Sequence, residues 1–220
     1  MCPSVDGVLL ESGELISAGM VVVATAGWSS GLLQKSVGLS IPTIRLHATA
    51  GRTEPLDDAG TSSAAPFPNV GVWSDDCAFR LRNDGGLTIA DGGHFEEHDI
   101  ALETLVHGWR FLPSLKKHWA QTHLKLRKDS FPTPRTDACP EPAHSRLLFA
   151  AERFAELFPG RAPLQMAESW AGFIDITPDM VPVIDAVAIE GLVVSTGYSG
   201  HGLGIAPGVR FSAVFRLFCH

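Results

Sequence analysis

The chain has 220 residues and a formal net charge of −7 at pH 7, with 45% hydrophobic and 19% charged residues. This length can bury a sizeable core in one large domain or two small ones. The negative charge argues against a nucleic-acid surface and a polybasic membrane patch. We expect a soluble cytoplasmic protein, because no leader pattern opens the chain and no apolar run reaches the length of a membrane span.

The cysteines and histidines predict neither a disulfide framework nor a metal site. The four cysteines are scattered, without a C-x-x-C pair. His94 and His98 could share one face of a helix, but Gly92 and Gly93 indicate a loop there. No set of histidines and carboxylates repeats a known ligand spacing, so we expect no metal.

The first part of the chain predicts a hairpin, a buried strand and a helix. Residues 8–10 and 15–16 flank a Ser-Gly turn, which is typical of a small hairpin. Residues 20–24 form a continuous apolar run that suits a buried parallel strand. The run ends in T-A-G-W-S-S, where Ser29 or Ser30 can cap a following helix.

The next stretch predicts an antiparallel sheet. Apolar and polar side chains alternate between residues 41 and 55, which indicates a half-buried strand with odd and even positions on opposite faces. Two further strands are expected over 70–73 and 78–82. An N-D-G-G turn at 83–86 then leads to a strand over 87–90, and such a turn between alternating runs is a strong hairpin signal.

Two helices and a strand are expected after this hairpin. Residues 97–112 and 146–158 both carry apolar side chains at helical spacing. Ser145 can cap the second helix, and Pro159-Gly160 can end it. A strand over 164–169 follows. The inward residues of the second helix are expected to be Leu147, Leu148, Ala151, Phe154, Ala155 and Phe158.

The most informative stretch runs from Trp170 to Gly208. It contains a W-x-G step, a T-P-D turn, an apolar strand at 192–196 and the loop T-G-Y-S-G-H-G-L-G-I-A-P. A β-branched run followed by clustered glycines predicts a strand, a tight loop and the start of a helix. Such glycines let the backbone approach a flat or anionic group, although their spacing is not that of the G-x-G-x-x-G nucleotide fingerprint.

This ordered string resembles the flavin-facing C-terminal segment of the FAD-dependent amino-acid oxidoreductases, which include D-amino-acid oxidases and dehydrogenases, glycine oxidase and sarcosine oxidase. The A-G-W-S stretch at residues 26–29 is similar to the same family, but Ala26 stands where the family usually has glycine, and its methyl group could crowd the cofactor. The resemblance implies an α+β fold: a substrate domain with a mixed or antiparallel sheet and flanking helices, plus the remnant of an FAD-binding Rossmann-like domain.

The resemblance also divides the chain. Residues 1–40 correspond to the last strand and helix of the FAD-binding domain, 41–165 to the substrate domain, and 166–220 to a return segment with the glycine-rich loop and a terminal helix. The family's βαβ unit should precede Met20 by a long way. We therefore expect a fragment or truncated gene product, or a second chain that supplies the nucleotide-binding half. The tail after Val209 lacks the family's acidic residues, which indicates an altered end.

The implied reaction is oxidation of the CH–NH bond of an amino or imino acid by hydride transfer to FAD, which carries the chemistry. The alternative is a non-catalytic remnant or a subunit that needs a separate nucleotide-binding chain. A membrane-associated electron acceptor also stays open. The residues expected to contact the cofactor are Ala26, Gly27, Trp28, Gly172, Gly197, Ser199, Gly200, His201, Gly202, Leu203 and Gly204.

Two side chains are candidates for catalysis, His201 and Arg80. His201 could place a hydrogen bond or a positive charge near the flavin, or it could be a structural loop histidine. An amino-acid carboxylate calls for an arginine, but Ile174 stands where the glycine-oxidase pattern has one. Arg80 or Arg82 could replace it. Only one of these two is expected to face the cavity, and both could instead face solvent.

Overall fold

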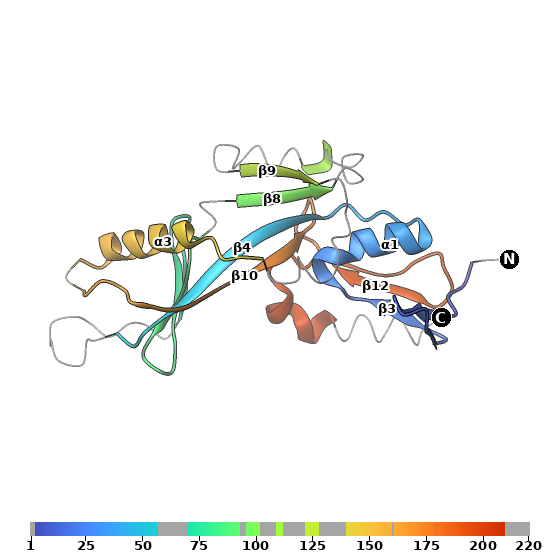
Figure 1. Cartoon of the computed structure of the whole chain (residues 1–220), viewed down its shortest axis with the longest axis horizontal. Coiled ribbons are helices and arrows are strands. Elements are labelled where there is room, and N and C mark those ends of the chain that lie inside the picture. The colour runs from blue at the N-terminus through green and yellow to red at the C-terminus, as the bar shows by residue number, and fades with distance from the viewer. Residues whose placement is uncertain are drawn as a thin grey trace.

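The described part of the chain forms three β-sheets with flanking helices, so the expected α+β class is confirmed. In the elongated molecule of Figure 1, α1 (Ser29–Val37) lies near one end and α3 (His144–Leu157) near the other. Among the described helices, none is long and apolar enough to cross a membrane. This computed structural model describes residues 3–56, 70–92, 96–101, 109–111, 122–127, 140–159 and 161–209.

The N-terminal hairpin and the first helix form where the sequence predicts them. β1 (Gly7–Leu9) pairs antiparallel with β2 (Leu15–Ser17). α1 follows soon after, but the predicted serine cap is wrong, because neither serine side chain caps the helix. Ser30 Oγ instead donates to the Ile41 carbonyl at 2.9 Å, and Ser29 Oγ lies 3.0 Å from Thr25 Oγ1.

The three-stranded sheet contains β11 (Val183–Ala186), β12 (Leu192–Thr196) and β3 (Val21–Val23), in that order. β12 runs antiparallel to β11 and parallel to β3, which confirms the expected parallel pairing. The expected burial of β3 is only partly right, because Val23 is 6% exposed whereas Val22 is 52% exposed. Continuous β-branched runs favour such a strand, because both of its faces can be buried. The core between this sheet and α1 contains Val23, Leu33, Ile41, Leu192 and Val194.

The seven-stranded sheet is built around β4 (Ile44–Thr53). β10 pairs antiparallel with β4 over almost its whole length, whereas β7 and β8 pair with opposite ends of its other edge. The N-D-G-G turn joins β6 to β7 as predicted. The remaining strands of this sheet are β5 (Gly71–Trp73), β6 (Ala78–Leu81), β7 (Leu87–Ala90), β8 (Glu96–Ala101), β9 (Thr122–Arg127) and β10 (Met166–Ile176).

The helix expected over residues 97–112 is wrong in its first part, where the chain forms β8. This strand pairs antiparallel with β4 and parallel with β9, which the sequence did not predict. Both pairings are nonlocal, so the spacing of apolar residues along one segment could not reveal them. Residues 109–111 form a short 3₁₀ turn, and most of the remaining expected helix lies outside the described residues.

α3 packs on one face of the large sheet, close to where the sequence predicts a helix. Phe154 and Ala150 of α3 contact a cluster that includes Phe79 and Leu87. Two details are wrong. Ser145 does not cap the helix, since its N-cap residue is Ala143. Leu148 and Ala155 were expected to face inward but are exposed, Leu148 to 63%, because Ala150 and Phe154 set the buried face.

Pairing places β10 in the large sheet, and β11 and β12 in the smaller one. The chain therefore leaves the small sheet after α1, builds the large sheet, and returns through β10 to the small sheet. The proposed division at residues 40 and 165 stays a prediction. The expected altered tail lies almost wholly outside the described residues, which end at residue 209.

Candidate functional site

Two loops meet at one edge of the three-stranded sheet. β3 leads into η1 (Ala26–Trp28), and β12 leads into the glycine-rich loop, residues 197–201. Because β3 and β12 are parallel, both loops leave the sheet at the same edge. Thr196 Oγ1 lies 3.3 Å from the carbonyl oxygen of Ala26, within hydrogen-bonding distance. The structure thus brings together two stretches that lie far apart in the sequence.

The glycine-rich loop has a backbone conformation that few side chains permit. Gly197 and Gly200 have φ values of 74° and 81°. A Cβ atom at Gly197 would lie 2.5 Å from Cγ2 of Thr177, so glycine is required there for both conformation and space. Ser199 also adopts a positive φ, 51°, and its side chain is buried. The conformation of the loop therefore depends on its glycines and on the residues that pack against it.

A helix begins directly after this loop, at residues 202–209 (the red helix in Figure 1). The carbonyl oxygen of His201 accepts the amides of Gly204 and Ile205 at 3.1 and 3.2 Å. The amides of Gly202 and Leu203 donate to no acceptor in the part of the chain that the structure describes. Since Leu203 is 94% exposed, this helix presents free donors and the positive end of its dipole to the surface.

The loop lies over one face of the large sheet. A Cβ atom at Gly200 would be 3.9 Å from the side chain of Ile174 on β10. Gly172 shares this face, because side chains two residues apart in a strand point the same way, and its cross-strand partner is Ala48. A Cβ atom at Gly172 would meet no atom of the described residues within 4 Å. Small residues therefore leave open space on the sheet next to the loop.

The two candidate arginines differ in their surroundings. Arg82 forms an ion pair with Asp84 in the hairpin turn, and its Nη1 lies 3.5 Å from the Thr53 carbonyl. Arg80 is exposed, whereas its neighbour Phe79 is buried in the core with α3. Arg80 therefore points to the face opposite α3, which is also the face of Gly172. Among the described residues, Arg80 has no ion-pair partner, and its role as the cation for a substrate stays a prediction.

Three predicted cofactor residues lie in η1, and they point in different directions. Ala26 is exposed and has φ 48°. A Cβ atom at Gly27 would lie 3.0 Å from Cδ of Arg45, so this glycine packs against the large sheet. The Trp28 ring contacts Phe173 edge to face, with centroids 6.3 Å apart. Gly27 and Trp28 thus have structural contacts, and a contact with a cofactor stays a prediction for all three.

Asp175 is the residue at this site that sequence reasoning passed over. It lies on β10, is only 5% exposed, and its carboxylate accepts hydrogen bonds from Thr196 Oγ1, at 2.8 Å, and from the Gly197 amide. The signal was a carboxylate among apolar residues of a strand, two positions before the T-P-D turn.

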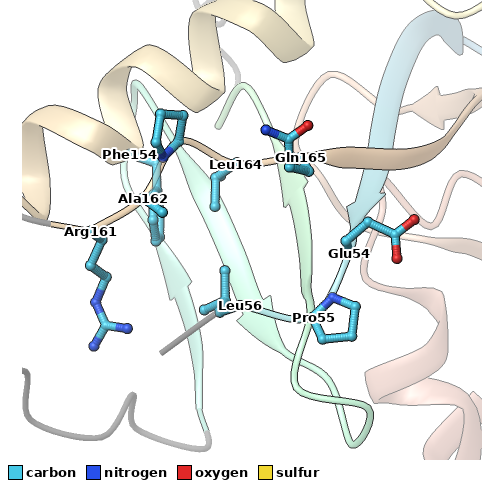
Figure 2. Close-up of a pocket in the computed structure, with 9 residues that line it drawn as sticks. Glu54, Pro55, Leu56, Phe154, Arg161, Ala162, Leu164 and Gln165 are labelled. Carbon is cyan, nitrogen blue, oxygen red and sulfur yellow. The ribbon is translucent and has the colours of Figure 1, made fainter. Parts of the chain in front are cut away.

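A separate hollow lies at the outer end of the large sheet, where β4 ends near the C-terminus of α3 (Figure 2). It shares no residue with the glycine-rich loop or with the open face around Gly172. The residues that line this hollow include Glu54, Leu56, Phe154, Arg161, Leu164 and Gln165.

Within the described ranges, no group of three histidine, cysteine or acidic residues could hold a metal ion.

Comparison with known families gives a match over nearly the whole chain. The family model for FAD dependent oxidoreductases matches residues 3–209. A curated relative, D-amino acid dehydrogenase from Paramagnetospirillum magneticum, is 35% identical over 72 residues, which are 33% of this chain and 17% of that protein.

Solved structures with the same fold are also known. L-amino acid deaminase from Proteus vulgaris superposes with a TM-score of 0.79 at 20% identity, covering 99% of this chain and 52% of that one. Glycine oxidase from Geobacillus kaustophilus gives a TM-score of 0.61 at 17% identity, covering 94% of this chain and 43% of that one. The chain thus spans about half the length of these structures and a smaller share of the curated relative.

Proposed function

The chain belongs to the FAD-dependent oxidoreductase family, and on that premise we propose that it forms the flavin-facing and substrate-facing half of an enzyme that oxidises the CH–NH bond of an amino or imino acid. The observation that carries this proposal is the position of the glycine-rich loop. It leaves the parallel strand β12 and lies directly beside the open face of the large sheet. In this arrangement a flat cofactor can lie against the backbone of the loop. A substrate can lie on the open face of the large sheet, which then forms the floor of its cavity.

The described residues fit a flavin ring. Free amides at Gly202 and Leu203 can donate to a group that gains negative charge, and the helix dipole favours the same charge. The space above Gly172 is open, so a planar group can approach β10 without displacing a side chain. FAD, when bound, supplies the acceptor for the hydride that leaves the substrate.

The substrate half of the site is the face that carries Gly172, Ile174 and Arg80. Ile174 leaves an apolar surface next to the loop, which suits the carbon skeleton of an amino acid. Arg80 is the proposed partner of the substrate carboxylate, because a guanidinium can bind both carboxylate oxygens. His201 is exposed just before the helix, and we assign it a supporting hydrogen bond near the flavin.

The proposal predicts that ligands with a flavin ring bind this chain better than the nucleotide alone. FAD and riboflavin should raise the unfolding temperature of the purified chain, whereas ADP should not, because the described residues face the ring and not the dinucleotide. Gly172→Leu should abolish the shift, since its side chain would fill the open space. Gly71→Leu on β5 is the matched control, because a Cβ atom there also meets nothing within 4 Å.

Two results would contradict this assignment. Stabilisation by ADP as strong as that by riboflavin would place the binding elsewhere. An equal flavin response in wild type and Gly172→Leu would show that the open face of β10 is not part of the site.

Arg80 can be tested in protein that carries flavin. Arg80→Gln should weaken binding of an amino acid at least about tenfold, the loss expected for one charge-assisted pair. It should leave the binding of the corresponding amino-acid amide, which has no carboxylate, almost unchanged. The perturbation of the flavin absorption spectrum measures both affinities. Equal losses for acid and amide would remove Arg80 from the carboxylate site.

A second candidate function is that of a subunit that works only with a separate nucleotide-binding chain. The helix at residues 202–209 and the strand β3 support it, because Leu203 is 94% exposed and Val22 is 52% exposed. Exposed apolar side chains on neighbouring elements are typical of an interface. Co-expression with a βαβ nucleotide-binding chain should then give a stable heterodimer on size exclusion. A monomer that binds flavin unaided would contradict this alternative.

A further inference from the structure

Asp175 accepts one hydrogen bond from the end of β12 and two from the glycine-rich loop. Its carboxylate Oδ2 accepts hydrogen bonds from Thr196 Oγ1, at 2.8 Å, and from the Gly197 amide. Its main-chain carbonyl accepts the Ser199 amide at 2.9 Å. One residue of β10 therefore holds the end of β12 and the first turn of the loop.

These contacts act where the loop conformation is least favourable. Gly197, Ser199 and Gly200 all have positive φ angles, and such a backbone persists only when its surroundings hold it. The Ser199 hydroxyl reinforces the arrangement, because it accepts the Thr177 amide at 3.3 Å. The amides of Gly202 and Leu203 follow directly, so the orientation of the helix start depends on how this loop leaves β12.

The carboxylate also connects the two sheets. Asp175 lies on β10 of the large sheet, whereas Thr196 ends β12 of the small one. The Thr196 hydroxyl also lies 3.3 Å from the carbonyl of Ala26, so the same small network reaches η1. A buried carboxylate with charge-assisted hydrogen bonds fixes geometry more strongly than a neutral pair would. Asp175 is only 5% exposed, which keeps water from competing for these donors.

We propose that Asp175 is a positioning residue that fixes the glycine-rich loop, and with it the free amides of Gly202 and Leu203, in the orientation that binds the flavin ring. The link to flavin rests on the proposed function. The hold on the loop stands on the hydrogen bonds alone, so the two parts can be tested separately.

The first test measures amide hydrogen exchange at residues 197–200 in the full chain without added flavin. Asp175→Ala removes the acceptor of the Gly197 amide, and exchange there should rise roughly tenfold to a hundredfold, the factor that one charge-assisted hydrogen bond supplies. Asp175→Asn keeps the shape and one acceptor oxygen but loses the charge. It should therefore give a smaller rise at the same residues.

Two further variants make the test independent of whether Asp175→Ala folds. Thr196→Val removes one donor from the carboxylate and should also raise exchange in the loop, whereas Thr196→Ser keeps the hydroxyl and should restore protection. Asp179→Ala is the matched control. Among the described residues its carboxylate accepts the Val181 amide alone, at 3.1 Å in the neighbouring turn, so Asp179→Ala should alter exchange at 181 and not at 197–200.

The second test adds riboflavin and FAD to the same proteins and records the flavin absorption bands. Asp175→Asn should weaken riboflavin binding by about the factor measured for loop opening, with shifted bands in the bound state, while Asp179→Ala should match wild type. If wild type binds no flavin, the proposed function fails, and the exchange data still decide the hold on the loop.

Three results would overturn the proposal. Unchanged exchange at 197–200 in the Asp175 variants would show that the carboxylate does not hold the loop. A uniform rise in exchange throughout β10 and β12 would make Asp175 a residue of general stability. Opening of the loop without any change in flavin affinity or spectrum would separate Asp175 from the flavin site.

Discussion

At the scale of single residues, Ala26 shows how a departure from a family pattern becomes a physical feature. The sequence marks it as an alanine where glycine is usual, and the structure gives it φ 48°, a left-handed conformation. That conformation costs a residue with a Cβ atom about 1–2 kcal/mol. The methyl group is exposed, so the cost is one of backbone conformation and not of crowding within the described chain.

Ala26→Gly should therefore stabilise the protein. The relief of left-handed strain exceeds the extra backbone entropy that glycine loses on folding, and a net gain of roughly 0.5–1 kcal/mol is expected. Urea unfolding measures the difference, with Ala24→Gly as a control that should destabilise the chain. A loss of stability in Ala26→Gly would mean that this residue does not adopt a positive φ in solution.

Cys77 gives a prediction about pH. Burial, and secondarily the charge of Asp76, raise the pKa of its thiol from 9.0 to about 11. The folded state therefore favours the protonated thiol, and the stabilisation is present below pH 9 and lost as pH rises towards 11. Wild type should lose on the order of 2 kcal/mol more than Cys77→Ala across this interval. Parallel stability curves for the two proteins would contradict the burial of the thiol.

The residues of the site were only partly predictable. The sequence located the glycine-rich loop because the positive φ angles at Gly197 and Gly200 require glycine, which leaves a visible pattern. It did not find Asp175, because the role of that carboxylate depends on its hydrogen-bond donors, Thr196 and Gly197. These donors follow Asp175 by about twenty residues in the sequence, and only the fold brings them close to it. It also could not separate Arg80 from Arg82, whose difference lies in the ion pair with Asp84.

At the scale of elements, the sequence predicted those strands and turns that local residue patterns specify, and it missed those that depend on pairing with distant segments. The strand β12 was predicted with its observed bounds, because a β-branched run ends at a glycine. The hairpin between β6 and β7 follows from its turn residues. β8 and β9 were missed, because they form by pairing, β8 with β4 and β9 with β8, and not from a local pattern of residues.

The buried face of α3 yields a direct test of the packing. Phe154 is 1% exposed and its ring centroid lies 5.2 Å from that of Phe79, whereas Leu148 on the same helix is 63% exposed. Phe154→Ala should cost about 3–5 kcal/mol, because it removes a large side chain from the core and leaves a cavity. Leu148→Ala should cost less than about 1 kcal/mol. Chemical denaturation measures both, and similar losses would mean that α3 packs through a different face.

At the scale of the whole molecule, the fold explains why one half of a larger architecture can be recognised by itself. The core of the large sheet with α3 and the core of the small sheet with α1 are both closed by elements of this chain. Val22 of β3 is 52% exposed, and Leu203 of the helix that follows the glycine-rich loop is 94% exposed. The loops at residues 26–28 and 197–201 leave the small sheet at the same end, and the proposed cofactor site lies there.

The measurement that tests the central claim most directly is the visible absorption spectrum of the purified chain after incubation with FAD and desalting. We expect flavin bands to remain with the protein and to shift on addition of an amino acid, because the glycine-rich loop and the open face around Gly172 are both present. A colourless protein whose unfolding temperature FAD leaves unchanged would contradict the claim that this chain by itself contacts the flavin.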